Sequence, residues 1–354
     1  MFLPPQEKYE QTDIEKAQQV MLSALSLASS PSIPPTKAAP DQQQGPALAL
    51  SLGPFGAQCQ PGQEYAGLYP APFGSKPTPS NFGFSPRAGQ VIEPLPLDEV
   101  RLTSLMPQGG GASAPRTSEQ DHLAAWHLTR LRHFAASADW SSIGVIAFET
   151  IPILTELKAI RQAMVVFNDE ERRRGRDLVP FYVSFVFPLD ERGEAKFPDA
   201  DMQTLELDEQ LSELMTWCYA PVSGPRPTQE RDLPAGVGIN CSNPDHIGRI
   251  SDALSRALDQ ILPRESEVKP WLVVYPDGGA VYDAVFTKTW SNPSGMDEQT
   301  WAEKLATTVS KALTYRRSNG TDDLFGGVVA GGCCKAGPSY IKALRKVCED
   351  KGLL

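Results

Sequence analysis

Three of the six cysteines stand directly after short apolar runs, where a strand would give way to the next element. Cys241 closes the run GVGINC, and Cys333 and Cys334 close VVAGGCC. Adjacent cysteines bond to one another only with local strain, and the two glycines before this pair let the backbone approach a ligand closely. Two neighbouring thiolates and a third from another strand end would suit a tetrahedral zinc ion with one open position, as in catalytic zinc sites. The alternatives are a redox-active vicinal pair and inert buried thiols.

Glu149 ends another apolar run, IGVIAFETIP. A carboxylate at such a position is costly to bury without a partner, so we expect it to bind a substrate ammonium group at the end of the strand. The alternative is a structural salt bridge, or an acid at the N-terminus of the following helix. Asn240, the neighbour of Cys241, is expected either to hydrogen-bond substrate or to orient the cysteine loop.

Two further strand-like runs end in turns that contain polar side chains. Ser51 and Gly53 lie in SLGPFGA, whose Gly-Pro pair indicates a tight turn. This segment is expected to be a ligand-binding loop or a simple turn. Tyr275 and Asp277 lie in a second turn of this kind, with the same two alternatives.

The histidines show no spacing that is typical of a metal site. His122 and His127 stand five residues apart in a predicted helix, not three or four as residues of one helix face do. His133 and His246 are isolated. We expect all four at the surface or with satisfied partners in helices. The remaining cysteines are expected to be small hydrophobic residues: Cys59, Cys218 and Cys348.

Alternating helical and strand-like segments must position these residues. Apolar residues spaced three and four apart predict helices within 14–28, 123–134, 154–164, 247–261, 301–313 and 341–347. Continuous apolar runs predict buried strands at 47–53, 143–149, 179–187, 236–240, 271–275 and 325–332. Such runs are typical of a parallel sheet covered on both faces, so the alternation predicts an α/β fold.

The polar residues distinguish a barrel from an open sheet. Glu149, Cys241, Tyr275 and Cys333 follow four different strands, and a TIM (β/α)8 barrel likewise takes its reactive groups from the C-terminal ends of several strands. An open doubly wound sheet would concentrate its site at one switch point, usually with a glycine fingerprint, and the sequence has none. A closed barrel needs eight strands. The six strand candidates are two short of that number.

Charge and composition narrow the class of partner. The formal net charge of −10 argues against nucleic acid or an anionic membrane surface as the main partner. No run approaches the roughly 18 apolar residues of a membrane span, and the first residues lack the pattern of a secretory signal. We expect a cytoplasmic protein, where clustered cysteines favour metal or catalysis over a disulfide. We expect a single domain over 1–354, with irregular surface insertions near 29–46, 60–118 and 221–235.

Five segments resemble, in order, the homocysteine S-methyltransferase family, whose members use S-methylmethionine or S-adenosylmethionine as donor. They are LSLGPFGAQCQPGQEYAGLY, IGVIAFETIPILTELKAI, GVGINCSNPDHI, WLVVYPDGGAVYD and FGGVVAGGCCKAGPSYIKAL. The resemblance implies that Cys241, Cys333 and Cys334 are zinc ligands and that Glu149 binds homocysteine. It also implies a TIM barrel, and methyl transfer from the sulfonium donor to the homocysteine thiolate, which gives methionine.

The chain departs from this family at its start. Members usually begin with a strand that carries an Asp-Gly-Gly type motif, whose acid helps to bind substrate, and a second strand follows. Neither strand is found here, so the resemblance implies a TIM (β/α)8-type barrel that is incomplete, with about six strands because the first two are missing. The chain is expected to be truncated at its start. Two alternatives to an active enzyme follow: a truncated, inactive homologue, and a zinc-binding or redox-sensing protein without transferase activity.

Overall fold

The computed structural model describes residues 11–28, 47–59, 62–74, 118–221, 229–263, 269–282, 290–291, 295–318, 320 and 322–354. The predicted insertions at 60–118 and 221–235 lie only partly within these ranges, and the one at 29–46 lies outside them. The expectation of a single domain over 1–354 therefore stays a prediction.

A six-stranded parallel sheet forms the frame of the described residues. Its strands, in their order across the sheet, are β1 (Leu48–Leu52), β2 (Ile143–Ile151), β3 (Phe181–Phe185), β4 (Gly236–Asn240), β5 (Trp271–Tyr275) and β8 (Gly327–Ala330). All neighbouring pairs are parallel. A separate antiparallel pair consists of β6 (Val281–Tyr282) and β7 (Trp290–Ser291). The predicted α/β class and the six predicted strands are confirmed.

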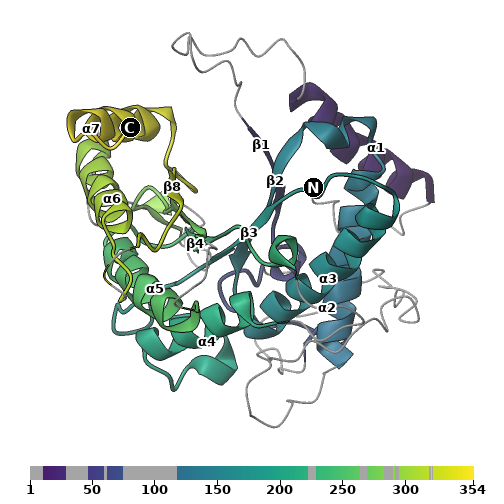
Figure 1. Cartoon of the computed structure of the whole chain (residues 1–354), viewed down its shortest axis with the longest axis horizontal. Coiled ribbons are helices and arrows are strands. Elements are labelled where there is room, and N and C mark those ends of the chain that lie inside the picture. The colour runs from purple at the N-terminus through teal and green to yellow at the C-terminus, as the bar shows by residue number, and fades with distance from the viewer. Residues whose placement is uncertain are drawn as a thin grey trace.

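The sheet curls along the inner side of an arc of helices, so that together they form part of a barrel, as predicted (Figure 1). The helices are α1 (Gln11–Ala28), α2 (Ser118–Ala135), α3 (Leu154–Arg173), α4 (Leu207–Tyr219), α5 (Ile247–Ile261), α6 (Glu298–Leu313) and α7 (Pro338–Asp350). Neighbouring helices pack along the arc, α2 against α3, α4 against α5 and α6 against α7. None of the described helices is long and apolar enough to cross a membrane.

The helix α4 is not among the helices predicted from the sequence. It begins with a capping box, in which the side chain of Glu206 accepts from the backbone of Glu209 and that of Glu209 accepts from Glu206. Its buried face includes Leu211, Leu214 and Cys218, which are spaced three and four apart. The helical period was therefore present in the sequence, and Cys218 is buried as expected.

One hydrophobic cluster fills the space between the sheet and the helices, and it extends from α1 to α7. Ile239 of β4 and Val274 of β5 are fully buried within it. Neighbouring residues of a strand point to opposite faces. Asn240 and Tyr275, which follow these two residues, therefore point to the inner side of the curled sheet.

Candidate metal centre and substrate-binding residues

The three cysteines predicted to bind zinc meet at one end of the sheet. Cys241 directly follows β4, and Cys333 and Cys334 lie in the loop between β8 and α7. Their sulfur atoms all lie within 4.8 Å of one another, and the sulfurs of Cys241 and Cys334 are 4.0 Å apart. Cys241 and Cys333 are joined by a disulfide. The structure therefore brings together three cysteine sulfurs from two separate strand ends.

The end of β5 lies between these two strand ends and fixes both by backbone hydrogen bonds. Cys241 has a left-handed backbone, with φ of 47°, and its N–H donates to the carbonyl of Tyr275 over 3.3 Å. The N–H of Cys333 donates to the carbonyl of Pro276 over 2.8 Å. Tyr275, the last residue of β5, and Pro276, which follows it, therefore set the spacing of the two cysteine-bearing loops.

Gly278 allows the cysteine loop to lie directly against the turn after β5. Its N–H donates to the carbonyl of Cys334 over 2.8 Å. A Cβ at this position would stand 2.7 Å from the backbone of Lys335, which is closer than real Cβ contacts allow. The turn around Asp277, ambiguous in the sequence, therefore serves as a support for the thiol groups.

The chemistry of the three cysteines and the spacing of Cys241 and Cys334 fit a zinc ion. Three thiolates held at about 2.3 Å from one ion in a tetrahedron stand about 3.8 Å apart, close to the 4.0 Å between Cys241 and Cys334. Burial and the negative charge of Asp277 raise the pKa of the Cys334 thiol, so a nearby cation would be needed to favour its thiolate. Both sulfurs of the Cys241–Cys333 disulfide would have to be reduced before they could act as ligands.

Glu149 stands at the same end of the sheet and accepts hydrogen bonds from two other strands. Ser51 of β1 donates to its Oε1 atom, and the hydroxyl of Tyr275 donates to its Oε2 atom over 2.9 Å. Burial and the charge of Glu149 raise the pKa of Tyr275, so the phenol stays protonated and can donate. The predicted substrate residues Glu149 and Ser51 therefore lie in contact, and Tyr275 joins them.

Asn240 and Gly53 occupy more internal positions than the predicted substrate-binding role suggests. Asn240 is fully buried, and its amide bonds Thr150 and Ser184. The carbonyl of Gly53 accepts from the guanidinium of Arg130 over 2.8 Å. In the described residues these contacts tie both positions to the protein itself.

A buried polar network behind the Gly53 loop was missed in the sequence. The carboxylate of Glu156 on α3 accepts from the backbone N–H of Phe55 over 2.7 Å, from the hydroxyl of Tyr69, and from Nε2 of His127 over 3.0 Å. His127 is fully buried; its Nε2 has the expected partner in Glu156, whereas its buried Nδ1 has no hydrogen-bond partner among the described residues. Nothing in the spacing of these residues shows that they meet, because they come from the loop after β1, from α2 and from α3.

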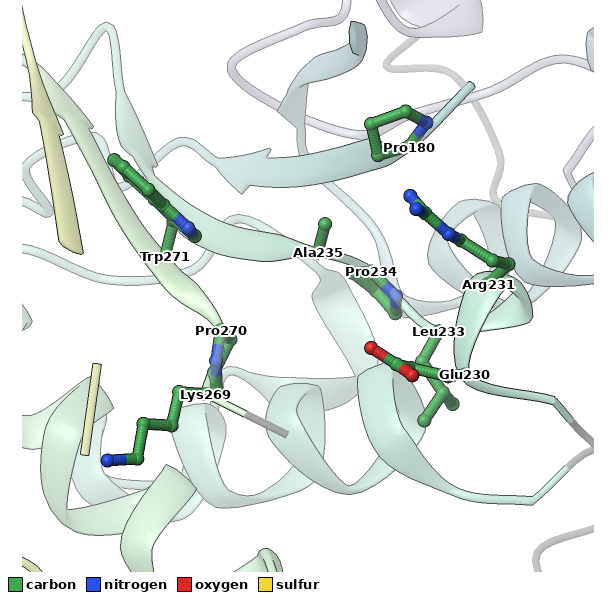
Figure 2. A pocket seen from close by; sticks show the side chains of 9 residues that line it. All are labelled: Pro180, Glu230, Arg231, Leu233, Pro234, Ala235, Lys269, Pro270 and Trp271. Atoms are coloured by element: carbon green, nitrogen blue, oxygen red, sulfur yellow. The ribbon is translucent and has the colours of Figure 1, made fainter. Parts of the chain in front are cut away.

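A cavity of about 310 Å³ lies at the opposite end of the sheet (Figure 2). Trp271, which begins β5, lines it together with Pro180 and Ala235, which directly precede β3 and β4. The charged residues Glu230, Arg231 and Lys269 also line it, with Leu233, Pro234 and Pro270. The cysteines stand at the C-terminal ends of the strands, so this cavity is separate from them.

The fold and the site together define a class of protein. It is an α/β partial barrel with cysteines and an acid at the C-terminal ends of its strands. The family model described as "Homocysteine S-methyltransferase" matches residues 99–348. This match covers more than half of the chain, so the chain belongs to the homocysteine S-methyltransferase family.

Two curated proteins with names from this family are similar in sequence. Homocysteine S-methyltransferase 3 of Arabidopsis thaliana is 33% identical over 115 residues, which are 32% of this chain and 26% of that protein. Homocysteine S-methyltransferase YbgG of Bacillus subtilis (strain 168) is 24% identical over 305 residues, which are 84% of this chain and 60% of that protein. The chain thus spans less than two thirds of the length of either relative.

Solved structures of the homocysteine methyltransferase MmuM from Escherichia coli show a distant likeness. The metallated form is 16% identical with a TM-score of 0.42, covering 95% of this chain and 68% of that chain. The apo form is 14% identical with a TM-score of 0.37, covering 95% of this chain and 69% of that chain.

Proposed function

We propose that this chain transfers a methyl group from a sulfonium donor, S-methylmethionine or S-adenosylmethionine, to the sulfur of homocysteine, with a zinc ion held by Cys241, Cys333 and Cys334. Membership of the family supports the acceptor and the reaction type. The observation that carries the proposal is the meeting of three cysteine sulfurs within 4.8 Å of one another. They come from two strand ends that flank the strand carrying Tyr275, the partner of Glu149.

The acid is the group of this chain best placed to recognise an amino acid. A carboxylate offers about four lone-pair positions, and the hydrogen bonds from Ser51 and Tyr275 use two of those of Glu149. The free positions can accept from the ammonium group of homocysteine. Tyr275 also accepts from the N–H of Cys241 through its carbonyl, so one residue sets the position of the acid relative to a thiol.

The methyl transfer itself requires alignment more than acid–base chemistry. When bound, zinc would lower the pKa of the homocysteine thiol and favour its thiolate at neutral pH. The thiolate sulfur attacks the methyl carbon, a new C–S bond forms, and the C–S bond of the donor breaks with its electron pair left on the donor sulfur. The donor leaves as a neutral thioether, so the protein need not protonate a leaving group. Glu149 and the loop after Ser51 would hold acceptor and donor in line, which is a large orientation effect.

A redox role is the second candidate, and the disulfide between Cys241 and Cys333 favours it. Cys334 lies 4.0 Å from the sulfur of Cys241 and could exchange with that bond by thiolate attack. A disulfide and a three-thiolate metal site use the same sulfurs and exclude one another. The methyltransferase proposal therefore places the protein in a reducing compartment such as the cytoplasm.

The two candidates separate in a methyl-transfer assay on reduced protein. Methionine formation from homocysteine would be measured with each sulfonium donor, for the chain itself, for Cys334→Ser and for Cys348→Ser as the control outside the cluster. The proposal expects turnover with at least one donor, its loss together with bound zinc in Cys334→Ser, and neither loss in Cys348→Ser. Bound zinc without turnover with either donor, or turnover that survives in Cys334→Ser, would contradict it.

A further inference from the structure

The residue after the acid has an unusual backbone. Thr150 has a φ of 62°, in the left-handed region that β-branched residues almost never adopt. The pairing of β2 with β3 is also irregular here, since the register shifts between Phe148 and Ile151. Such a bulge bends a strand and re-aims its side chains. Glu149 and Thr150 are the two residues between these pairing positions, so the direction of the Glu149 side chain depends on the bulge.

Asn240 holds this bulge from β4, two strands away. Its Oδ1 atom accepts from the backbone N–H of Thr150 over 2.8 Å, and its Nδ2 atom donates to the Thr150 hydroxyl over 2.6 Å. The oxygen and the nitrogen of the Asn240 side-chain amide are therefore both hydrogen-bonded to Thr150. Because Asn240 is fully buried, these bonds are made away from water, where leaving them unmade is costly.

Two further side chains, Ser184 and Tyr275, lie between the amide of Asn240 and the carboxylate of Glu149. Ser184 donates to Oδ1 of Asn240 over 2.8 Å and lies 2.8 Å from the hydroxyl of Tyr275. Tyr275 in turn donates to Glu149. With Ser184 donating to Asn240 and Tyr275 donating to Glu149, neither hydroxyl has a proton left to donate to the other. Asn240 therefore supports the acid through the backbone of Thr150.

We propose that Asn240 is a positioning residue for Glu149, and that it acts by holding Thr150 in the left-handed conformation rather than by contacting substrate. It also directly precedes Cys241, so the same residue links the amine-binding acid to the first of the thiol groups. The kinetic consequences of this inference rest on the proposed function. Its consequences for the backbone of Thr150 and the position of Glu149 do not.

A pair of substitutions tests the mechanism. Asn240→Ala removes the support, and Thr150→Gly removes the need for it, because glycine adopts positive φ without steric cost. We expect Asn240→Ala to raise KM for homocysteine roughly tenfold, the equivalent of about one hydrogen bond, with less change in kcat and full zinc content. Thr150→Gly in the Asn240→Ala background should restore most of the affinity. Asn240→Ser, which keeps a polar group but shortens the side chain, serves if the alanine variant does not fold.

Asn168 provides a matched control. It is also buried, and its amide bonds Asp232 and the carbonyl of Arg231, away from the cysteines. Asn168→Ala should lose stability while KM for homocysteine stays unchanged. A rise in KM in Asn240→Ala that glycine at 150 does not rescue would mean that Asn240 contacts substrate, and loss of zinc would mean that it acts on Cys241; either overturns the proposal.

A crystal structure of the Asn240 variant tests the same idea without any turnover. We expect Thr150 to leave the left-handed region and the Glu149 carboxylate to separate from Ser51 and Tyr275, with both restored when Thr150 is also glycine. An unchanged bulge and acid in Asn240→Ala would overturn the proposal. If the parent chain shows no methyl transfer, the proposed function fails, and this structural result still decides the role of Asn240.

Discussion

At the scale of single residues, the carboxylate of Glu149 is the group that we propose recognises the substrate. It accepts from Ser51 and Tyr275 on two other strands and retains free lone pairs. Both donors are neutral, so its negative charge is available to a cationic ligand. A charged amino group of the substrate is the partner that this environment suits best.

Substituting Glu149→Gln keeps the shape of the side chain and removes its charge. A hydrogen bond between charged groups contributes about 1.5–3 kcal/mol, so we expect KM for homocysteine to rise roughly 10- to 150-fold while bound zinc stays the same. Steady-state kinetics with homocysteine varied measures this. Glu170→Gln, which alters a surface pair with Arg132, should leave KM unchanged, and an unchanged KM in Glu149→Gln would contradict the assignment.

Residues at strand ends could be recognised in the sequence, because a strand end is visible as the last position of an apolar run. The three cysteines and Glu149 were found in this way, and the structure brings the cysteines together. The contacts of Asn240 with Thr150 and Ser184 could not be found, because they depend on which strands are neighbours. The order of strands is a property of the assembled sheet, and spacing along the chain does not contain it.

At the scale of elements, the loop after β1 is fastened to α2 and α3 by the buried carboxylate of Glu156. This carboxylate accepts from Phe55 and Tyr69 in the loop and from His127 in α2. The same loop carries Tyr65, which interacts with the thiol of Cys334. The network therefore joins the loop that carries Tyr65 to the helices α2 and α3.

We expect Glu156→Gln to destabilise the protein by about 1–3 kcal/mol, because the amide nitrogen cannot accept the buried donors that the carboxylate satisfies. Urea unfolding followed by circular dichroism measures the change in the free energy of unfolding. Glu170→Gln, which removes only a partly exposed ion pair, should cost about 0–1 kcal/mol. Equal losses in the two variants would show that the buried network is not a fastening of this kind.

The pH dependence of stability reports on His127. Burial lowers its pKa below the ordinary value of 6.5, although Glu156 opposes this, so the folded protein keeps the ring neutral where the unfolded chain protonates it. Its contribution is therefore fully present above pH 6.5 and is lost as the pH falls below that value. His127→Gln keeps a donor for Glu156 but cannot titrate.

The free energy of unfolding should therefore fall more steeply between pH 7.5 and pH 5.5 in the parent chain than in His127→Gln. Urea unfolding at several pH values measures both slopes. Other groups that titrate in this range, including those near the thiols, are common to both proteins and cancel in the difference. Parallel slopes would contradict a buried neutral His127.

Helices and strands were predicted in the sequence where apolar residues repeat regularly. The helix α4 shows the limit, because its buried residues keep the helical period but stand in an acidic segment bordered by irregular chain. Its position is decided by packing against α5, a contact between residues far apart in the sequence. A regular pattern alone did not separate this helix from a loop.

At the scale of the whole molecule, the three thiols would link β4 to the end of β8, across β5. A ligand that binds only the folded state stabilises it, by about 2.7 kcal/mol when its free concentration is a hundredfold above Kd. Zinc should therefore raise the midpoint of thermal unfolding of the reduced protein, and a chelator should reverse the rise.

Thermal unfolding followed by circular dichroism, with zinc or with chelator, measures this stabilisation. Cys241→Ser should abolish the shift, because it removes the ligand from β4, whereas Cys348→Ser in α7 should retain it. A zinc-dependent shift of the same size in Cys241→Ser would place the metal elsewhere.

The curled parallel sheet was predictable because continuous apolar runs indicate strands covered on both faces, and because polar groups follow several strands rather than one. The way in which β5 and the residue after it space the two cysteine-bearing loops required the structure. The backbone bonds from Cys241 to Tyr275 and from Cys333 to Pro276 leave no mark in the sequence.

The most direct test of zinc-dependent methyl transfer is a zinc titration of metal-free, reduced protein, with methionine formation measured at each point. The proposed site predicts no turnover without metal, a rise in rate in proportion to bound zinc, and saturation at one zinc per chain. Full turnover by metal-free protein would contradict it.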